Sequence, residues 1–250
     1  MDLASFEPSA HYIAFAHVYK AFERPALVDC SFSLDAGSVL AVAGPPGSGK
    51  SLILQLIMGF ERPDRGKVAS AHETVESAED WERIRRKIVM ISQSTMLLES
   101  LTVKQNVAYF MQLREDYDEG NKALVADGLL QMGDLALERD LRPCDLPAAQ
   151  RRMLALLQIF GSQPQCILFD QPTAALDPRR SESLREVMLR VKKQLGMTML
   201  VATEDLDFIH QIADQVLLLD RGETVFFGNC SEFFASDDAR VQRYLRMEPA

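Results

Sequence analysis

The sequence lacks a long apolar run, a close pair of cysteines and a basic stretch at its start, and each absence excludes a class of protein. Its apolar runs, such as Leu56–Met58 and Cys166–Phe169, are far shorter than the roughly 20 residues that span a bilayer. The opening MDLASFEPSA has acidic residues and no basic group ahead of an apolar segment, so no secretory signal is expected. The default expectation is therefore a cytoplasmic protein.

Cysteines are also few, and basic side chains are outnumbered by acidic ones. The four cysteines form no CxxC pair, which argues against a zinc site and against a disulfide framework. We expect ordinary thiols at Cys30, Cys144, Cys166 and Cys230. The 27 Lys and Arg residues against 36 Asp and Glu give a net charge of −9, so no nucleic-acid partner is expected. At 250 residues, 47% of them hydrophobic, the chain is expected to form a single globular domain with subdomains.

Short apolar runs alternate with helical patterns along the chain, which predicts an α/β fold with a largely parallel sheet. The run Val39–Ala43 stops at a glycine and suits a strand buried on both faces, and apolar residues then recur at helical spacing between 52 and 57. Further predicted elements are strands at 165–169 and 197–202, a helix at 178–195, a hairpin at 216–227 that turns at Asp220–Gly222, and a helical insertion at 103–137.

Residues 44–51, GPPGSGKS, match the pattern GxxxxGK[ST] at every fixed position and lie between the predicted strand and helix. In such a loop the backbone N–H groups point at a phosphate, Lys50 adds a positive charge, and the Ser51 hydroxyl can bind Mg²⁺. A chance glycine-rich turn is the alternative, and the flanking strand and helix argue against it. Nucleotide-binding residues are thus predicted at Gly44, Pro45, Pro46, Gly47, Ser48, Gly49, Lys50 and Ser51.

A second motif lies downstream, where the apolar run Cys166–Asp170 ends in a carboxylate. Asp170 would then stand where it can hold Mg²⁺ beside the phosphates through water. Alone the signal is weak, because apolar strands often end in Asp at a turn. Together with the phosphate loop it predicts a Walker B strand.

In this order, and over nearly the whole chain, the motifs resemble the ATP-binding subunits of ABC transporters. The resemblance implies a P-loop NTPase fold with a mostly parallel core sheet, an antiparallel β portion near the N-terminus and an α-helical subdomain at about 94–150. It implies ATP and Mg²⁺ as ligands. It also assigns Gln93 to the Q-loop, where it would contact Mg²⁺, Asp177 to the D-loop, and Phe22 to the aromatic position against adenine. An ordinary core position is the alternative for Phe22.

The same resemblance implies partners. These are transmembrane permease subunits, contacted through the groove beside Gln93, and a second ATP-binding subunit in a homodimer or heterodimer, with the chain peripheral on the inner face of the cell membrane. A narrower likeness, in residues 59–66, 101–107 and 235–238, is to the Mla-type or MCE-associated ATPases that move lipids between bacterial membranes. Because the first two segments are similar in many bacterial importers, lipid transport and other import both stay open.

The chain departs from the family where ATP is hydrolysed. Gln171 replaces the glutamate that polarises the attacking water and cannot accept a proton at neutral pH, and such base catalysis is worth roughly 10²- to 10⁴-fold in rate. Glu204 replaces the switch histidine and brings a negative charge to the γ-phosphate. Pro46 also removes one donor that the family usually offers there.

The family signature Leu-Ser-Gly-Gly-Gln is altered as well. Proline in its second position has no hydroxyl and no N–H, and two alanines add methyl groups where the phosphate of the opposite subunit approaches. The five positions are Leu146, Pro147, Ala148, Ala149 and Gln150. In either a homodimer or a heterodimer, no nucleotide site would then be complete.

These departures lead us to expect an ATP-binding subunit with strongly impaired hydrolysis. One alternative is an ATPase whose changes are compensated, for example by a carboxylate elsewhere. A second is a nucleotide-independent structural subunit of a membrane complex. ABC proteins of DNA maintenance are disfavoured, because the chain has no coiled-coil insertion.

Overall fold

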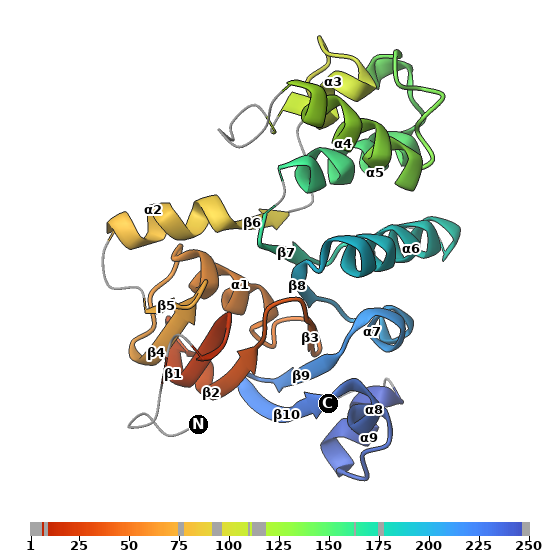
Figure 1. Ribbon diagram of the computed structural model, residues 1–250. Helices are drawn as coiled ribbons and strands as arrows, with labels where there is room; N and C mark the ends of the chain where they lie inside the picture. Colours follow the sequence, from red (N-terminus) through yellow and green to blue (C-terminus); the bar gives the residue numbers. More distant parts are fainter. Residues whose placement is uncertain are drawn as a thin grey trace. The chain divides into compact units, whose positions relative to one another are not determined.

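The computed structural model describes residues 7, 10–74, 78–91, 97–109, 111, 119–162, 164–174 and 178–246. The chain divides into two compact units (Figure 1). We call Met1–Ser92, Gln165–Ala174 and Gly196–Ala250 the core unit, and Gln93–Pro164 with Ala175–Leu195 the helical unit. In neither unit do the described helices include one that is long and apolar enough to cross a bilayer.

The core unit holds every strand that the structure describes. In chain order the strands are β1 (Ile13–Ala21), β2 (Pro25–Leu34), β3 (Val39–Ala43), β4 (Arg65–Ser70), β5 (Glu73–Thr74), β6 (Ile88–Ile91), β7 (Cys166–Asp170), β8 (Thr198–Ala202), β9 (Gln215–Asp220) and β10 (Glu223–Asn229). Its helices are α1 (Lys50–Met58), α2 (Ala78–Lys87), α7 (Leu206–Ile212), α8 (Cys230–Phe234) and α9 (Ala239–Leu245).

The strands form a mixed sheet in the order β5-β4-β1-β2-β10-β9-β3-β8-β7-β6. From β9 to β6 neighbouring strands are parallel, whereas β1, β2, β4 and β5 pair antiparallel. Strands β9 and β10 form the predicted antiparallel hairpin. The α/β class, the parallel core and the N-terminal antiparallel portion are therefore confirmed.

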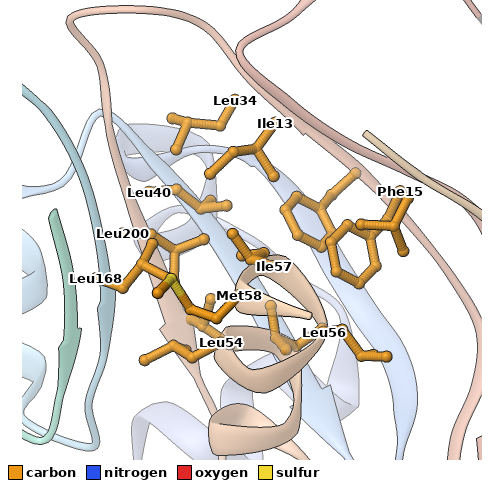
Figure 2. Packing of buried hydrophobic residues seen from close by; sticks show 14 of the residues in the cluster. Ile13, Phe15, Leu34, Leu40, Leu54, Leu56, Ile57, Met58, Leu168 and Leu200 are labelled. Carbon is orange, nitrogen blue, oxygen red and sulfur yellow. The ribbon is translucent and has the colours of Figure 1, made fainter. Parts of the chain in front are cut away.

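Helix α1 fastens the phosphate loop to the core. Its apolar residues pack between strands from both portions of the sheet (Figure 2), and Ile53, Leu54, Leu56 and Ile57 are fully buried. Residues drawn around them in Figure 2 are Ile13, Phe15, Leu34, Leu40, Leu168 and Leu200. The helix ends at Gly59, which takes the left-handed conformation that terminates many helices, and its N–H donates to Gln55 and Leu56.

The helical unit consists of α3 (Val103–Tyr109), α4 (Glu119–Met132), the 3₁₀ turn η4 (Pro143–Asp145), α5 (Ala148–Gly161) and α6 (Pro178–Leu195). Asn106, fully buried on α3, binds the preceding loop through its side chain, donating to Leu98, Leu101 and Thr102 and accepting from the Leu98 N–H. The insertion predicted at 103–137 is accordingly mainly helical where it is described, with turns at 133–137.

Candidate nucleotide site

The loop between β3 and α1 begins at Gly44, a position where only glycine fits without strain. Its φ of 146° lies outside the range that L side chains favour, and a Cβ would lie 2.2 Å from the Leu219 carbonyl oxygen and 2.5 Å from Ser48 Oγ. The loop ends at Gly49, which precedes α1 with a φ of 106°. The loop is thus wedged between the start of α1 and the end of β9.

Lys50, the first residue of α1, is only 4% exposed and points back into this loop. Its Nζ donates to the carbonyl oxygens of Gly44 at 2.7 Å and Pro45 at 2.8 Å. A third bond, of 2.9 Å, runs to Oε1 of Glu204. An ammonium has three donors, so each of them has a protein partner in this structure.

Glu204 owes its place to the end of β8. The Thr203 N–H donates to the Val42 carbonyl at 3.1 Å, which ties the residue after β8 to β3. Asp205 then caps α7 by accepting from the Phe208 N–H at 2.9 Å. Between these two anchors the Glu204 side chain, 40% exposed, reaches Lys50. The negative charge predicted near the γ-phosphate therefore meets the lysine that would bind that phosphate.

The residues proposed for Mg²⁺ are next to each other. Ser51 Oγ donates to Asp170 Oδ1 at 3.1 Å, which joins α1 to the end of β7. Mg²⁺ is commonly held by one or two protein oxygens together with water and phosphate oxygens. The donor set fits that cation, and the two oxygens come from the elements that the sequence predicts.

Two further features suit a bound phosphate. Ser48 Oγ is buried and has no hydrogen-bond partner in the described part of the chain. Helix α1 has no side chain capping its N-terminus among the described residues, and no acidic residue lies in its first turn. Free N–H groups at a helix start and an unpartnered buried hydroxyl are groups that a phosphate can satisfy.

Gln171 follows β7 directly in a left-handed conformation, with a φ of 50°. Its N–H donates to the Ala202 carbonyl at 2.8 Å, and its carbonyl accepts from the Ala174 N–H at 3.1 Å. This tight turn fixes the residue after Asp170 against the end of β8. The turn therefore presents a neutral amide where the family has its general base.

Other predicted site residues fall into three groups. Gln93 and Asp177 lie outside the described residues. Phe22, just after β1, is 60% exposed with Lys20 Nζ 5.3 Å from its ring centre, so the alternative of a core position is wrong. The signature segment belongs to the helical unit.

In the helical unit, Pro147 stands immediately before α5 with a φ of −55° and a ψ of 152°. Leu146 is buried, and Gln150 Nε2 donates to Glu138 Oε1 at 3.1 Å. The helix start is kept without the serine and glycines of the family. The N-cap side-chain oxygen that a serine would bring is missing from this position.

One contact escaped sequence reasoning. The hydroxyl of Tyr244, on α9, accepts a bond of 3.2 Å from the N–H of Gly44, 200 residues earlier in the chain. No motif or spacing marks this tyrosine, so only the tertiary structure reveals it.

A strand, phosphate loop and helix, with a second strand ending beside Ser51, define the class of P-loop nucleotide-binding proteins. Within that class the family is also clear, because residues 27–174 match the model of the ABC transporter family. The chain belongs to this family of ATP-binding domains.

Curated relatives are similar along most of the chain. The methionine import ATP-binding protein MetN of Haemophilus influenzae is 31% identical over 245 residues, which are 94% of this chain and 70% of that protein. MetN of Caulobacter vibrioides is 33% identical over 242 residues, covering 94% and 72%. The sulfate/thiosulfate import protein CysA of Synechococcus elongatus is 32% identical over 211 residues, covering 84% of this chain and 60% of its own length.

A solved structure of the same fold is cbiO1 from Clostridium perfringens, described as part of the ABC transporter complex cbiONQ. It superposes with a TM-score of 0.81 at 23% identity, covering 95% of this chain and 96% of its own. The expectation of an ABC ATP-binding domain is confirmed. The narrower likeness to lipid-transport ATPases finds no support in these named relatives, which are importers of other cargo by their printed names.

Proposed function

We propose that this chain is the ATP-binding subunit of an ABC transporter that binds Mg-ATP and hydrolyses it very slowly. The observation that carries the proposal is the ion pair between Lys50 and Glu204 at 2.9 Å, formed inside a phosphate loop that matches its pattern at every fixed position. The loop supports nucleotide binding. The Glu204 carboxylate, which is paired with Lys50, repels the additional negative charge of a γ-phosphate.

In this proposal the loop N–H groups and the start of α1 hold the phosphates, and Ser48 Oγ donates to them. Lys50 keeps its bonds to Gly44 and Pro45 and turns its third donor from Glu204 to the nucleotide. Ser51 and Asp170 are the residues that would hold Mg²⁺, which neutralises phosphate charge when it is bound.

Slow hydrolysis follows from the groups that flank this site. The Gln171 amide cannot take a proton from water, and Glu204 places a negative charge where a donor would steady the γ-phosphate. Two nearby carboxylates are already engaged in hydrogen bonds, because Asp170 accepts from Ser51 and Asp205 caps α7. These partners argue against the alternative in which one of these carboxylates compensates for Gln171.

Partners follow from the family. We propose that permease subunits bind the chain and hold it at the cytoplasmic face of a membrane, and that it pairs with itself or with another ATP-binding subunit. In such a pair each nucleotide lies between one subunit's phosphate loop and the other's signature. This chain would contribute a phosphate loop without a base and a signature without serine or glycine, so each site would lack at least one catalytic group.

Two observations point to different cargo. The likeness to lipid-transport ATPases lies in residues 59–66, 101–107 and 235–238, of which the first two are similar in many bacterial importers. The relatives' names assign methionine import or sulfate/thiosulfate import to those proteins. We propose import as the direction of transport, because the named relatives are importers. The identity of the permease that co-purifies with the chain would discriminate between lipid and other cargo.

The proposal is tested on the purified full chain by calorimetric titration with Mg-ATP and by steady phosphate release. We expect saturable binding with release that does not exceed that of a Lys50→Ala control. Steady release well above the control would favour the compensated ATPase. Absence of binding by the folded protein would favour the nucleotide-independent structural subunit.

A further inference from the structure

The phosphate loop is held from outside as well as from within. Inside, the Gly44 carbonyl accepts from Lys50 Nζ at 2.7 Å. Outside, the Gly44 N–H donates to the Tyr244 hydroxyl at 3.2 Å. The Leu219 carbonyl and Ser48 also pack closely against the Gly44 Cα, since a Cβ at this position would collide with both. Gly44 is therefore the fixed point at which β3 turns into the loop.

Helix α9 is firmly placed to supply this contact. Asp238 caps its start by accepting from the N–H groups of Arg240 and Val241, at 2.8 and 3.3 Å. Val241 is fully buried in a cluster that includes Ala41 and Ala43 of β3. The helix is thus anchored in the same apolar cluster as β3, the strand that leads into the phosphate loop.

The ring of Tyr244 is held by other aromatic side chains. Its centre lies 6.4 Å from that of Phe233, which in turn packs against Phe226 at 5.4 Å and Phe234 at 5.2 Å. Burial, together with the negative charge of Glu204, raises the pKa of Tyr244 to about 12, although the bond from Gly44 lowers it. The hydroxyl is therefore neutral at ordinary pH and accepts the bond from Gly44 as an uncharged group.

We propose that Tyr244 is a positioning residue of the nucleotide site, through which α9 holds the phosphate loop in the conformation that accepts phosphate. The chain of contacts runs from Tyr244 through Gly44 to Lys50 and Glu204. Loss of the hydroxyl leaves the Gly44 N–H without this partner and lets the loop sample other conformations. Binding must then order the loop, which lowers affinity. The inference rests on the proposed function, since it concerns the same nucleotide site.

The test is the affinity of full-length Tyr244→Phe for Mg-ATP and Mg-ADP, measured with a fluorescent nucleotide and competition. We expect both affinities to fall by about 3- to 10-fold, the effect of losing one neutral hydrogen bond. Tyr12→Phe is the matched control, because it removes another buried tyrosine hydroxyl of the core unit, which donates to Gln165. That control should bind nucleotide as the wild type does.

A second measurement separates a local change at the loop from a general loss of stability. In the nucleotide-free wild type, the Gly44 amide should exchange with solvent slowly, and Tyr244→Phe should raise its exchange rate more than tenfold while amides of β3 stay protected. If the wild type binds nucleotide and Tyr244→Phe binds it with the same affinity, the inference is overturned and the proposed function stays intact. Failure of the wild type to bind would instead overturn the proposed function.

Discussion

At the scale of single residues, the site depends on which partner Lys50 has. Two of its bonds go to carbonyls of the loop and fix the ammonium, and the third goes to a carboxylate that a phosphate must displace. Lys50 is almost fully buried, whereas Glu204 is partly exposed, so the carboxylate is the partner that water can more readily accommodate after displacement.

Replacing Lys50 by alanine should weaken Mg-ATP binding by about 10- to 100-fold, because a buried charged donor to phosphate is lost. The measurement is calorimetric titration of the variant beside the wild type. Lys67→Ala, on an exposed position of β4 in the same unit, is the control and should bind normally. Equal affinity in the Lys50 variant and the wild type would sink this prediction.

Replacing Glu204 by glutamine should tighten ATP binding by about 3- to 10-fold and ADP binding by less. The amide oxygen can still accept from Lys50, but it is uncharged, so it holds the lysine less strongly and no longer repels the γ-phosphate. The partial exposure of the site keeps the gain modest. The control is Glu82→Gln, which breaks an exposed ion pair with Arg86 on α2. The prediction fails if both nucleotides gain equally, or if ATP binds more weakly.

At the scale of elements, the strand and helix around the loop could be predicted from the sequence, because their signals are local. The apolar run of β3, the glycines of the loop and the helical spacing of α1 lie within 20 consecutive residues. The contact between α9 and the loop could not be predicted, because it joins positions 200 residues apart without any pattern. The ion pair was also missed, since the sequence indicated only that Glu204 would repel phosphate.

Alanine substitutions at two glycines should change the free energy of unfolding in opposite directions. Gly44→Ala should lower the free energy of unfolding by at least about 2 kcal/mol, because its Cβ collides with backbone and its φ is unfavourable. Gly128→Ala, inside α4 with no atom within 4 Å of the new Cβ, should raise it by about 0.5 to 1 kcal/mol. Urea denaturation measures both. A stable Gly44 variant with normal nucleotide binding would show that the loop can move away from β9.

At the scale of the whole molecule, the family fold is present, whereas the proposal assigns the loss of hydrolysis to replaced residues on three segments. The parallel core sheet, the N-terminal antiparallel portion, the phosphate loop and the closeness of Ser51 to Asp170 follow what the motifs and the resemblance predict. The changes at Gln171, Glu204 and the signature lie on three separate segments, two in the core unit and one in the helical unit. Groups that catalyse together contribute far from additively, so restoring one should achieve little.

We propose that nucleotide binding has been kept while hydrolysis has been strongly reduced through these three segments together. The most direct test is phosphate release by Gln171→Glu alone and by the full repair, which adds Glu204→His, Pro147→Ser, Ala148→Gly and Ala149→Gly, each beside a matching Lys50→Ala version. We predict little gain from Gln171→Glu and at least about a 100-fold gain from the full repair. Gln171→Glu reaching the rate of the full repair, or wild type already releasing phosphate at that rate, would contradict the account.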